Sequence, residues 1–154
     1  MKKEKVIFSQ YIIVKGIKYI VDGKKVVLEP SKKEIDMAIW LSKKLNKEVT
    51  ILPRINEPER IQTPDFSIEN DNWDLKTITS NKNNVMYNTL RNKENQSNNY
   101  VIDISKSKLT IKAINKQLND LFLLKGFNWL NKIIVKKNND IEINERKKVG
   151  NRSH

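Results

Sequence analysis

The sequence predicts a mixed α/β (α+β) domain that opens with a β-meander. Short runs of β-branched and aromatic residues are separated by turn-forming pairs, and two longer segments carry apolar residues at helical spacing. The length of 154 residues and the hydrophobic content of 38% suffice for one core of ordinary size. We therefore expect a single domain over residues 1–144, followed by a basic, flexible tail over residues 145–154.

The N-terminal segment predicts three short strands joined by tight turns. The pairs Lys15-Gly16 and Asp22-Gly23 mark the turns, because glycine readily adopts the left-handed backbone that hairpin turns need. The strands of this meander are expected over residues 5–14, 17–21 and 25–29.

The first helix is expected over residues 31–46, with Ser31 as its N-cap. Glu34 follows Ser31 at the spacing of a capping box. Glu34 also shares a helical stripe with Ala38 and Leu41, which places its carboxylate at the rim of the core.

Further strands and helices alternate after this helix. A second helix is expected to be polar and to be closed by Gln96-Ser97, and a third is expected to begin at the N-cap Thr110 and to end at Gly126. A loop is expected over residues 54–62. The strands are expected over residues 48–52, around Asp65, 74–79, 100–104, 129–135 and 141–143, and the helices over 82–95 and 110–125.

The composition favours a polyanionic partner and excludes several kinds of chemistry. The net charge is +12, from 30 Lys and Arg against 18 acidic residues, which favours nucleic acid. The abundance of Lys, Asn and Ile also fits an AT-rich genome, which accounts for part of this charge. The absence of Cys and the single His154 argue against zinc thiolate sites, Ser-His-Asp triads and His-based ribonuclease chemistry. The apolar runs are too short to span a bilayer, so we expect a soluble protein that acts in the cytoplasm.

Residues 63–76, with the sequence TPDFSIENDNWDLK, carry the most informative pattern of the chain. In an extended strand Asp74 and Lys76 project to the same side, and Trp73 and Leu75 project to the other. The intervening residues 69–72 are rich in turn formers and would fold the strand of Asp65 back beside that of Asp74. We therefore expect these charged groups to meet.

Two neighbouring carboxylates repel each other, and a hard divalent cation such as Mg²⁺ or Mn²⁺ relieves that repulsion. Asp65 and Asp74 are accordingly the candidate metal ligands. Lys76 would then orient or deprotonate a water molecule, or neutralise charge on a phosphate, so the predicted reaction is phosphodiester hydrolysis. An ordinary solvated ion pair and a simple turn are the alternative interpretation of the same residues.

The pairing of Pro64-Asp65 with Asp74-Leu75-Lys76 resembles the PD-(D/E)XK motif of restriction-endonuclease-like nucleases. Roughly residues 30–136, from the helix of Glu34 to beyond Gln96-Ser97, are similar to the tRNA-cleaving C-terminal domains of contact-dependent growth-inhibition toxins. Related domains also occur on phage and mobile-element proteins. The resemblance implies a restriction-endonuclease-like αβββαβ core, which agrees with the element order predicted here.

The resemblance also implies roles for two more residues. Glu34 would be a further acidic residue of the catalytic site, although a plain capping role explains it equally simply. Gln96 would point toward the site, although a solvated turn residue is the default interpretation. The resemblance further implies delivery as a toxin and an immunity protein as partner, which the basic charge predicts to be acidic.

We expect tRNA as the substrate, because the resemblance to the toxin domains is closer than that to any DNA-cleaving branch. A DNA endonuclease of the same fold, and a non-catalytic nucleic-acid-binding protein of a phage or mobile element, remain the alternatives. Candidate contacts to nucleic acid are Arg54, Arg60, Gln96, Lys106 and Lys108.

Overall fold

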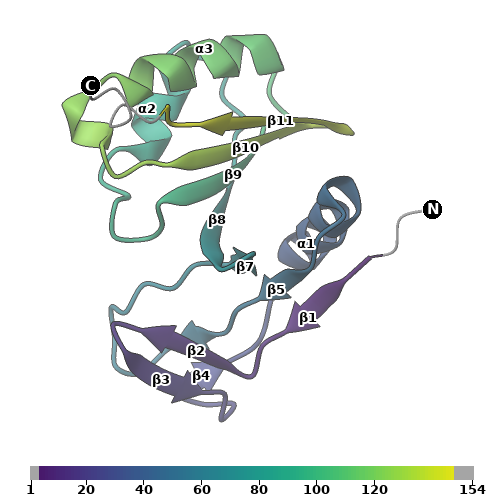
Figure 1. The fold of residues 1–154 in the computed structure, drawn as a ribbon, viewed down its shortest axis with the longest axis vertical. Coiled ribbons are helices and arrows are strands. Elements are labelled where there is room, and N and C mark those ends of the chain that lie inside the picture. Colours follow the sequence, from purple (N-terminus) through teal and green to yellow (C-terminus); the bar gives the residue numbers. More distant parts are fainter. Residues whose placement is uncertain (1–3, 148–154) are drawn as a thin grey trace, which may run out of the picture. The chain divides into compact units, whose positions relative to one another are not determined.

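The computed structural model describes residues 4–147, which form two compact units (Figure 1). The first unit comprises the chain up to Leu75 together with Asn95–Ser97. The second unit comprises Lys76–Glu94 and the chain from Asn98 onward. Strand β8 (Asp71–Thr77) passes from the first unit into the second between Leu75 and Lys76.

The first unit is a small sheet with one long helix, in the strand order β1-β5-β7-β8. β1 runs parallel to β5, whereas β7 is antiparallel to both β5 and β8. Helix α1 packs against β1 and β5. The remaining elements of this unit are β1 (Val6–Phe8), β2 (Tyr11–Val14), β3 (Ile17–Ile20), β4 (Val26–Val27), α1 (Lys32–Leu45), β5 (Val49–Ile51), β6 (Arg54–Ile55) and β7 (Phe66–Ile68).

The predicted N-terminal meander is wrong in its pairing. The first expected strand is interrupted at Ser9, whose hydroxyl donates a hydrogen bond of 2.7 Å to the carbonyl of Tyr11. Only β2 and β3 form a hairpin, since β1 joins the main sheet beside β5. β4 pairs with β6, so the segment predicted as a loop from Arg54 begins as a strand. These pairings join residues far apart in sequence, which local patterns do not encode.

The second unit is a sheet covered by helices. β9 runs parallel to β10, and β10 is antiparallel to β11. The fully buried side chains include Tyr100, Ile102, Ile114, Leu118 and Ile133, which form one apolar cluster. The elements of this unit are α2 (Val85–Leu90), β9 (Asn99–Asp103), α3 (Ile111–Phe122), the 3₁₀ helix η1 (Lys125–Phe127), β10 (Lys132–Lys137) and β11 (Asp140–Glu145).

The helix starts predicted from capping residues are confirmed, but two helix ends are not. Ser31 caps α1, because its hydroxyl oxygen accepts a hydrogen bond from the N–H of Glu34, and Thr110 caps α3 in the same way by accepting from the N–H of Ala113. α2 stops at Leu90, far before Gln96, because Asn92 takes a left-handed backbone with φ 64°. α3 stops at Phe122, and Gly126 lies in the following η1.

Glu145 and Arg146, which were predicted as part of the flexible tail, belong to the folded structure. Glu145 is the last residue of β11, and the guanidinium of Arg146 donates hydrogen bonds to the carbonyls of Leu130, Phe122 and Phe127. These bonds occupy the carbonyl group of the last residue of α3 and two carbonyl groups of the segment that follows it. Residues 148–154, the rest of the predicted tail, lie outside the described residues.

The order of the central elements is confirmed: α1, then β5, β7 and β8, then α2 and β9. This is a mixed α+β fold with the predicted helix, three-strand, helix, strand succession, to which the short β6 is added. Within residues 4–147, no helix has the length and hydropathy needed to cross a membrane.

Candidate functional site

The β7–β8 hairpin brings together the two halves of the TPDFSIENDNWDLK segment. Its turn consists of Glu69 and Asn70, both with a left-handed backbone (φ 49° and 70°), as in the tight turns that suit twisted strands. The register pairs Phe66 with Trp73 and Ile68 with Asp71. The predicted folding of Asp65 back beside the strand of Asp74 is therefore confirmed.

Asp65 is fixed by both neighbouring strands. Its N–H donates to the carbonyl of Trp73 over 3.0 Å, and its carbonyl accepts a 3.1 Å hydrogen bond from Leu52 N. Its carboxylate oxygen Oδ2 accepts a 2.8 Å hydrogen bond from the backbone N–H of Leu75. This last donor could not be found from sequence patterns, because it is a main-chain group placed by strand pairing.

The two aspartates form an electrostatically strained pair. Asp74 is buried, with only 7% of its surface exposed, so it is not part of a solvated surface ion pair. Burial, the neighbouring Asp74 carboxylate and a hydrogen bond with Glu34 raise the pKa of Asp65 to about 8, against the opposing effect of Leu75 N–H. At neutral pH Asp65 therefore holds a proton that a lone aspartate would release.

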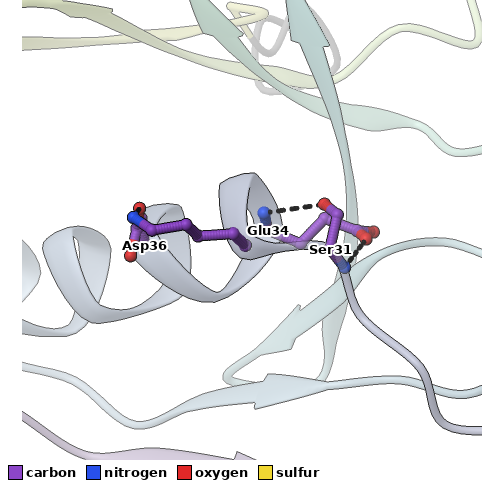
Figure 2. A network of polar contacts seen from close by, with 4 residues as sticks. Ser31, Glu34 and Asp36 are labelled. Atoms are coloured by element: carbon purple, nitrogen blue, oxygen red, sulfur yellow. Dashed lines mark hydrogen bonds and ion pairs between the residues drawn. The ribbon is translucent and has the colours of Figure 1, made fainter.

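Glu34 serves as a capping residue and also contacts Asp65. Ser31 N donates to Glu34 Oε1 over 2.8 Å, and Glu34 N donates to Ser31 Oγ over 3.1 Å, which completes the capping box (Figure 2). Burial acts to raise the pKa of Glu34, but the hydrogen bond from Asp65, the bonds from Ser31 and the charge of Arg54 hold that pKa below its usual value. Asp36 lies farther along α1 and pairs with Lys32 instead.

A small pocket of the first unit collects these groups. Glu34, Arg54 and Asp65 all line it, with Leu52 and Pro64 among its apolar walls. Arg54 lies on β6 and is exposed, and the pocket, with a volume of about 10 Å³, has room for about one water molecule or small ion. The structure thus places three of the predicted residues around one concavity.

Lys76 follows Asp74 in β8 but belongs to the second unit. Its side chain is half-buried. Because alternate residues of a strand project to the same side, the strand itself directs Lys76 to the side of Asp74. The presentation of Asp74 and Lys76 on one side of the strand stays a prediction from this alternation.

The remaining residues predicted to contact nucleic acid lie on different segments of the structure. Gln96 lies next to Ser97, whose hydroxyl donates a 2.8 Å hydrogen bond to the carbonyl of Asn72 in β8, so the segment of Gln96 is held beside the strand of Asp74. Arg60 lines a different pocket of the first unit. Lys106 and Lys108 are exposed residues of the turn after β9 in the second unit.

The donor set suits a hard cation. Carboxylate oxygens are the ligands that Mg²⁺ and Mn²⁺ prefer, and a cation beside Asp65 and Asp74 would replace the proton that burial and the repulsion between the carboxylates retain. Among residues 4–147, no three acidic or histidine side chains are already arranged to hold a metal. Mg²⁺ commonly uses only one or two carboxylates and completes its shell with water and substrate phosphates, so the aspartate pair fits this mode.

The raised pKa of Asp65 predicts that stability depends on pH. Between its ordinary pKa of 3.8 and about 8, the folded protein binds a proton that the unfolded chain lacks. In EDTA, the free energy of unfolding should therefore fall as the pH rises through this window, by about 1.4 kcal/mol per pH unit, and level off above it. Denaturant titrations at several pH values measure this slope.

Asp65→Asn should remove this contribution and raise stability at pH 8, because the amide needs no proton. Asp36→Asn, an exposed acid on the same unit, is the matched control and should keep the wild-type slope. A wild-type slope that survives in Asp65→Asn would assign the proton to another group.

Comparison with known proteins agrees with this architecture. A chain of the CdiA-CT/CdiI toxin and immunity complex from Burkholderia pseudomallei is similar in fold, with a TM-score of 0.62, 21% identity, and coverage of 92% of this chain and 98% of that chain. No curated protein sequence matches significantly. The family model for the contact-dependent growth inhibition CdiA C-terminal domain matches residues 62–141, which include Asp65, Asp74 and Lys76. The chain therefore belongs to the family of contact-dependent growth inhibition CdiA C-terminal domains.

Proposed function

We propose that this chain is a toxin domain that acts as a metal-dependent endonuclease of the PD-(D/E)XK type and cleaves RNA, most specifically tRNA. The pairing of the half-buried Asp65 with the buried Asp74 carries the proposal, since the raised pKa of Asp65 keeps a proton on it at neutral pH and Asp65 is hydrogen-bonded to Glu34. A solvated ion pair would show neither burial nor a raised pKa. Membership of the CdiA C-terminal family supports a toxic, nuclease-like activity.

In the proposed mechanism Asp65 and Asp74 hold the cation, with Glu34 as the adjacent acid. A bound Mg²⁺ or Mn²⁺ would supply Lewis acidity at the position held by Asp65 and Asp74. Asp65 gives up its proton when the site is loaded, because a nearby positive charge favours the ionised carboxylate. The N–H of Leu75 keeps the Asp65 carboxylate in a fixed orientation throughout.

Lys76 orients the attacking water or neutralises the charge that develops on the phosphate, because its position in β8 directs it to the side of Asp74. Arg54, on the rim of the same pocket, binds a phosphate oxygen of the substrate. Gln96 approaches from the segment that Ser97 ties to β8 and offers an amide to the same substrate. The net charge of +12 favours a polyanion as the substrate.

A cleavage assay tests the proposal. Purified protein should cut total tRNA with Mg²⁺ or Mn²⁺ and should be inactive in EDTA. Asp74→Asn and Lys76→Ala should each lower the rate by at least about 100-fold, because the first removes a proposed metal ligand and the second removes the cation that would neutralise charge on the phosphate. Asp36→Asn and Lys24→Ala remove the same charges at exposed positions and should cut like the wild type.

The assay includes plasmid DNA as a second substrate. If only DNA is cleaved, the assignment of the catalytic site holds and the substrate is DNA rather than tRNA. Metal-independent cleavage, or full activity in Asp74→Asn, would contradict the assignment of the site.

Two substitutions separate the capping role of Glu34 from its proposed catalytic role. Glu34→Gln keeps the capping box, since glutamine serves at that position, but removes the charge beside Asp65. It should leave stability nearly unchanged and lower the cleavage rate by about 100-fold. Ser31→Ala removes the cap and should cost about 1 kcal/mol of stability with a much smaller effect on the rate. If Glu34→Gln cuts at the wild-type rate, Glu34 has the capping role alone.

We also propose an acidic immunity protein as the partner. The similar Burkholderia pseudomallei structure is a toxin and immunity complex, and a basic surface favours an acidic partner. Without such a partner, expression of the wild-type chain should arrest the growth of a bacterial host, whereas Lys76→Ala at equal expression should not. Equal growth of the two strains would count against a toxin that depends on this site.

A further inference from the structure

The first unit contains a second, larger pocket of about 430 Å³. Its walls include Val14, Lys15, Tyr19, Arg60, Gln62 and Asn95. Pockets that bind small molecules typically have volumes of about 300–1,000 Å³. None of Glu34, Asp65 and Asp74 lines this pocket, so it is distinct from the acidic site.

The apolar residues that line the pocket pack against a small hydrophobic core. Val14, Tyr19 and Ile61 pack against a small core made by Ile12, Val26 and Ile55. Tyr19 is paired with Ile12 across the β2–β3 hairpin, which fixes its backbone (Figure 1). A half-buried tyrosine ring on a fixed strand offers a surface on which a planar ring can stack.

The two cations on the walls occupy unusual backbone positions. Lys15 and Arg60 both have a left-handed backbone, with φ 50° and 67°. This conformation costs a residue with a side chain roughly 1–2 kcal/mol, and Asn or Gly adopts it more readily. Lys15 takes this conformation as the first residue of the Lys15-Gly16 turn of the β2–β3 hairpin, and Arg60 takes it in the turn that follows Pro58. Two long cationic side chains therefore line one pocket from positions where local backbone preference would favour Asn.

The remaining polar groups are side-chain amides. Gln62 and Asn95 each offer both a donor and an acceptor. Such amides can read the donor and acceptor pattern along the edge of a base. A stacking ring, two cations and two amides are together the groups that recognise a base and its phosphate.

The pocket also lies close to Asp65 within the first unit, and residues of the two pockets share a hydrophobic core. Gln62 stands three residues before Asp65, so their Cα atoms are at most about 11 Å apart. Asn95 directly precedes Gln96, and Ser97 of the same segment is bonded to β8. Leu52 lines the acidic pocket and packs against the small core that carries the floor of the larger one.

We propose that this second pocket binds one unpaired nucleotide of the RNA substrate close to the cleaved bond. Tyr19 stacks on the base, Gln62 and Asn95 read its edge, and Lys15 and Arg60 bind its phosphate. This inference rests on the proposed nuclease function and adds a subsite that selects a single-stranded position.

Binding of nucleoside 5′-monophosphates tests the pocket without any cleavage. AMP, GMP, CMP and UMP would each be titrated into the wild-type protein by calorimetry, with inorganic phosphate as a separate titration. At least one nucleotide should bind about tenfold more tightly than phosphate, because stacking adds to the ionic contacts. Equal binding of phosphate and all four nucleotides would reduce the pocket to an anion site and overturn the proposal.

The key variant is Lys15→Asn combined with Arg60→Asn. Asparagine suits a left-handed backbone, so this double variant should be at least as stable as the wild type while its nucleotide affinity falls about tenfold or more. Tyr19→Leu should weaken binding by at least about fivefold and leave phosphate binding unchanged. Lys24→Asn combined with Lys25→Asn removes the same charge from exposed positions of the same unit and should bind like the wild type.

Cleavage kinetics distinguish this inference from the proposed function. With tRNA, the Lys15 and Arg60 double variant should raise KM with little change in kcat. If tRNA is cut but the double variant and the Lys24 and Lys25 control behave alike, the pocket proposal fails and the nuclease stands. If nucleotides bind as expected but no nucleic acid is cut, the nuclease proposal fails and the binding site stands.

Discussion

The repulsion between Asp65 and Asp74 is the constraint on which the candidate site depends. Partial burial and the neighbouring buried Asp74 carboxylate both disfavour the ionised form of Asp65, so the protein retains a proton on Asp65. Such an arrangement weakens the fold in the absence of a cation. Local arrangements that lower stability are common where a site must hold a ligand, because the ligand restores the lost interaction.

The surrounding structure keeps the pair together despite the repulsion. Asp65 is bonded through its backbone to β5 and β8 at once, so it cannot swing away without breaking strand pairing. The left-handed turn at Glu69 and Asn70 fixes the register that places Asp65 opposite the strand of Asp74. The capping box of α1 holds Glu34 in position, since one of its carboxylate oxygens is bound to Ser31 N. Backbone pairing and the turn therefore position Asp65 against the strand of Asp74, and the helix cap positions Glu34.

Local chemistry explains which parts of the structure were predictable. The caps at Ser31 and Thr110, the hairpin turn between Asp65 and Asp74, and the central order of helices and strands follow from short-range patterns. The pairing of β1 with β5 and of β4 with β6 was not predictable, because it joins segments separated by long stretches of chain. For the same reason the pocket that contains Lys15, Arg60 and Asn95 leaves no contiguous signal in the sequence. The raised pKa of Asp65 required the structure as well, since it arises from burial.

The candidate site is acidic, although the protein as a whole is basic. A cation would therefore be needed for a phosphate of the substrate to approach the site. The net charge of +12 attracts nucleic acid to the protein as a whole, but attraction at long range does not favour a phosphate next to Glu34, Asp65 and Asp74. Loss of the Asp65 proton would make the site still more negative. A divalent cation held by the carboxylates, as proposed, would make the local charge positive at the site alone. In the proposed mechanism the basic surface and the second pocket hold the RNA, and the acidic pair decides which phosphate meets the cation.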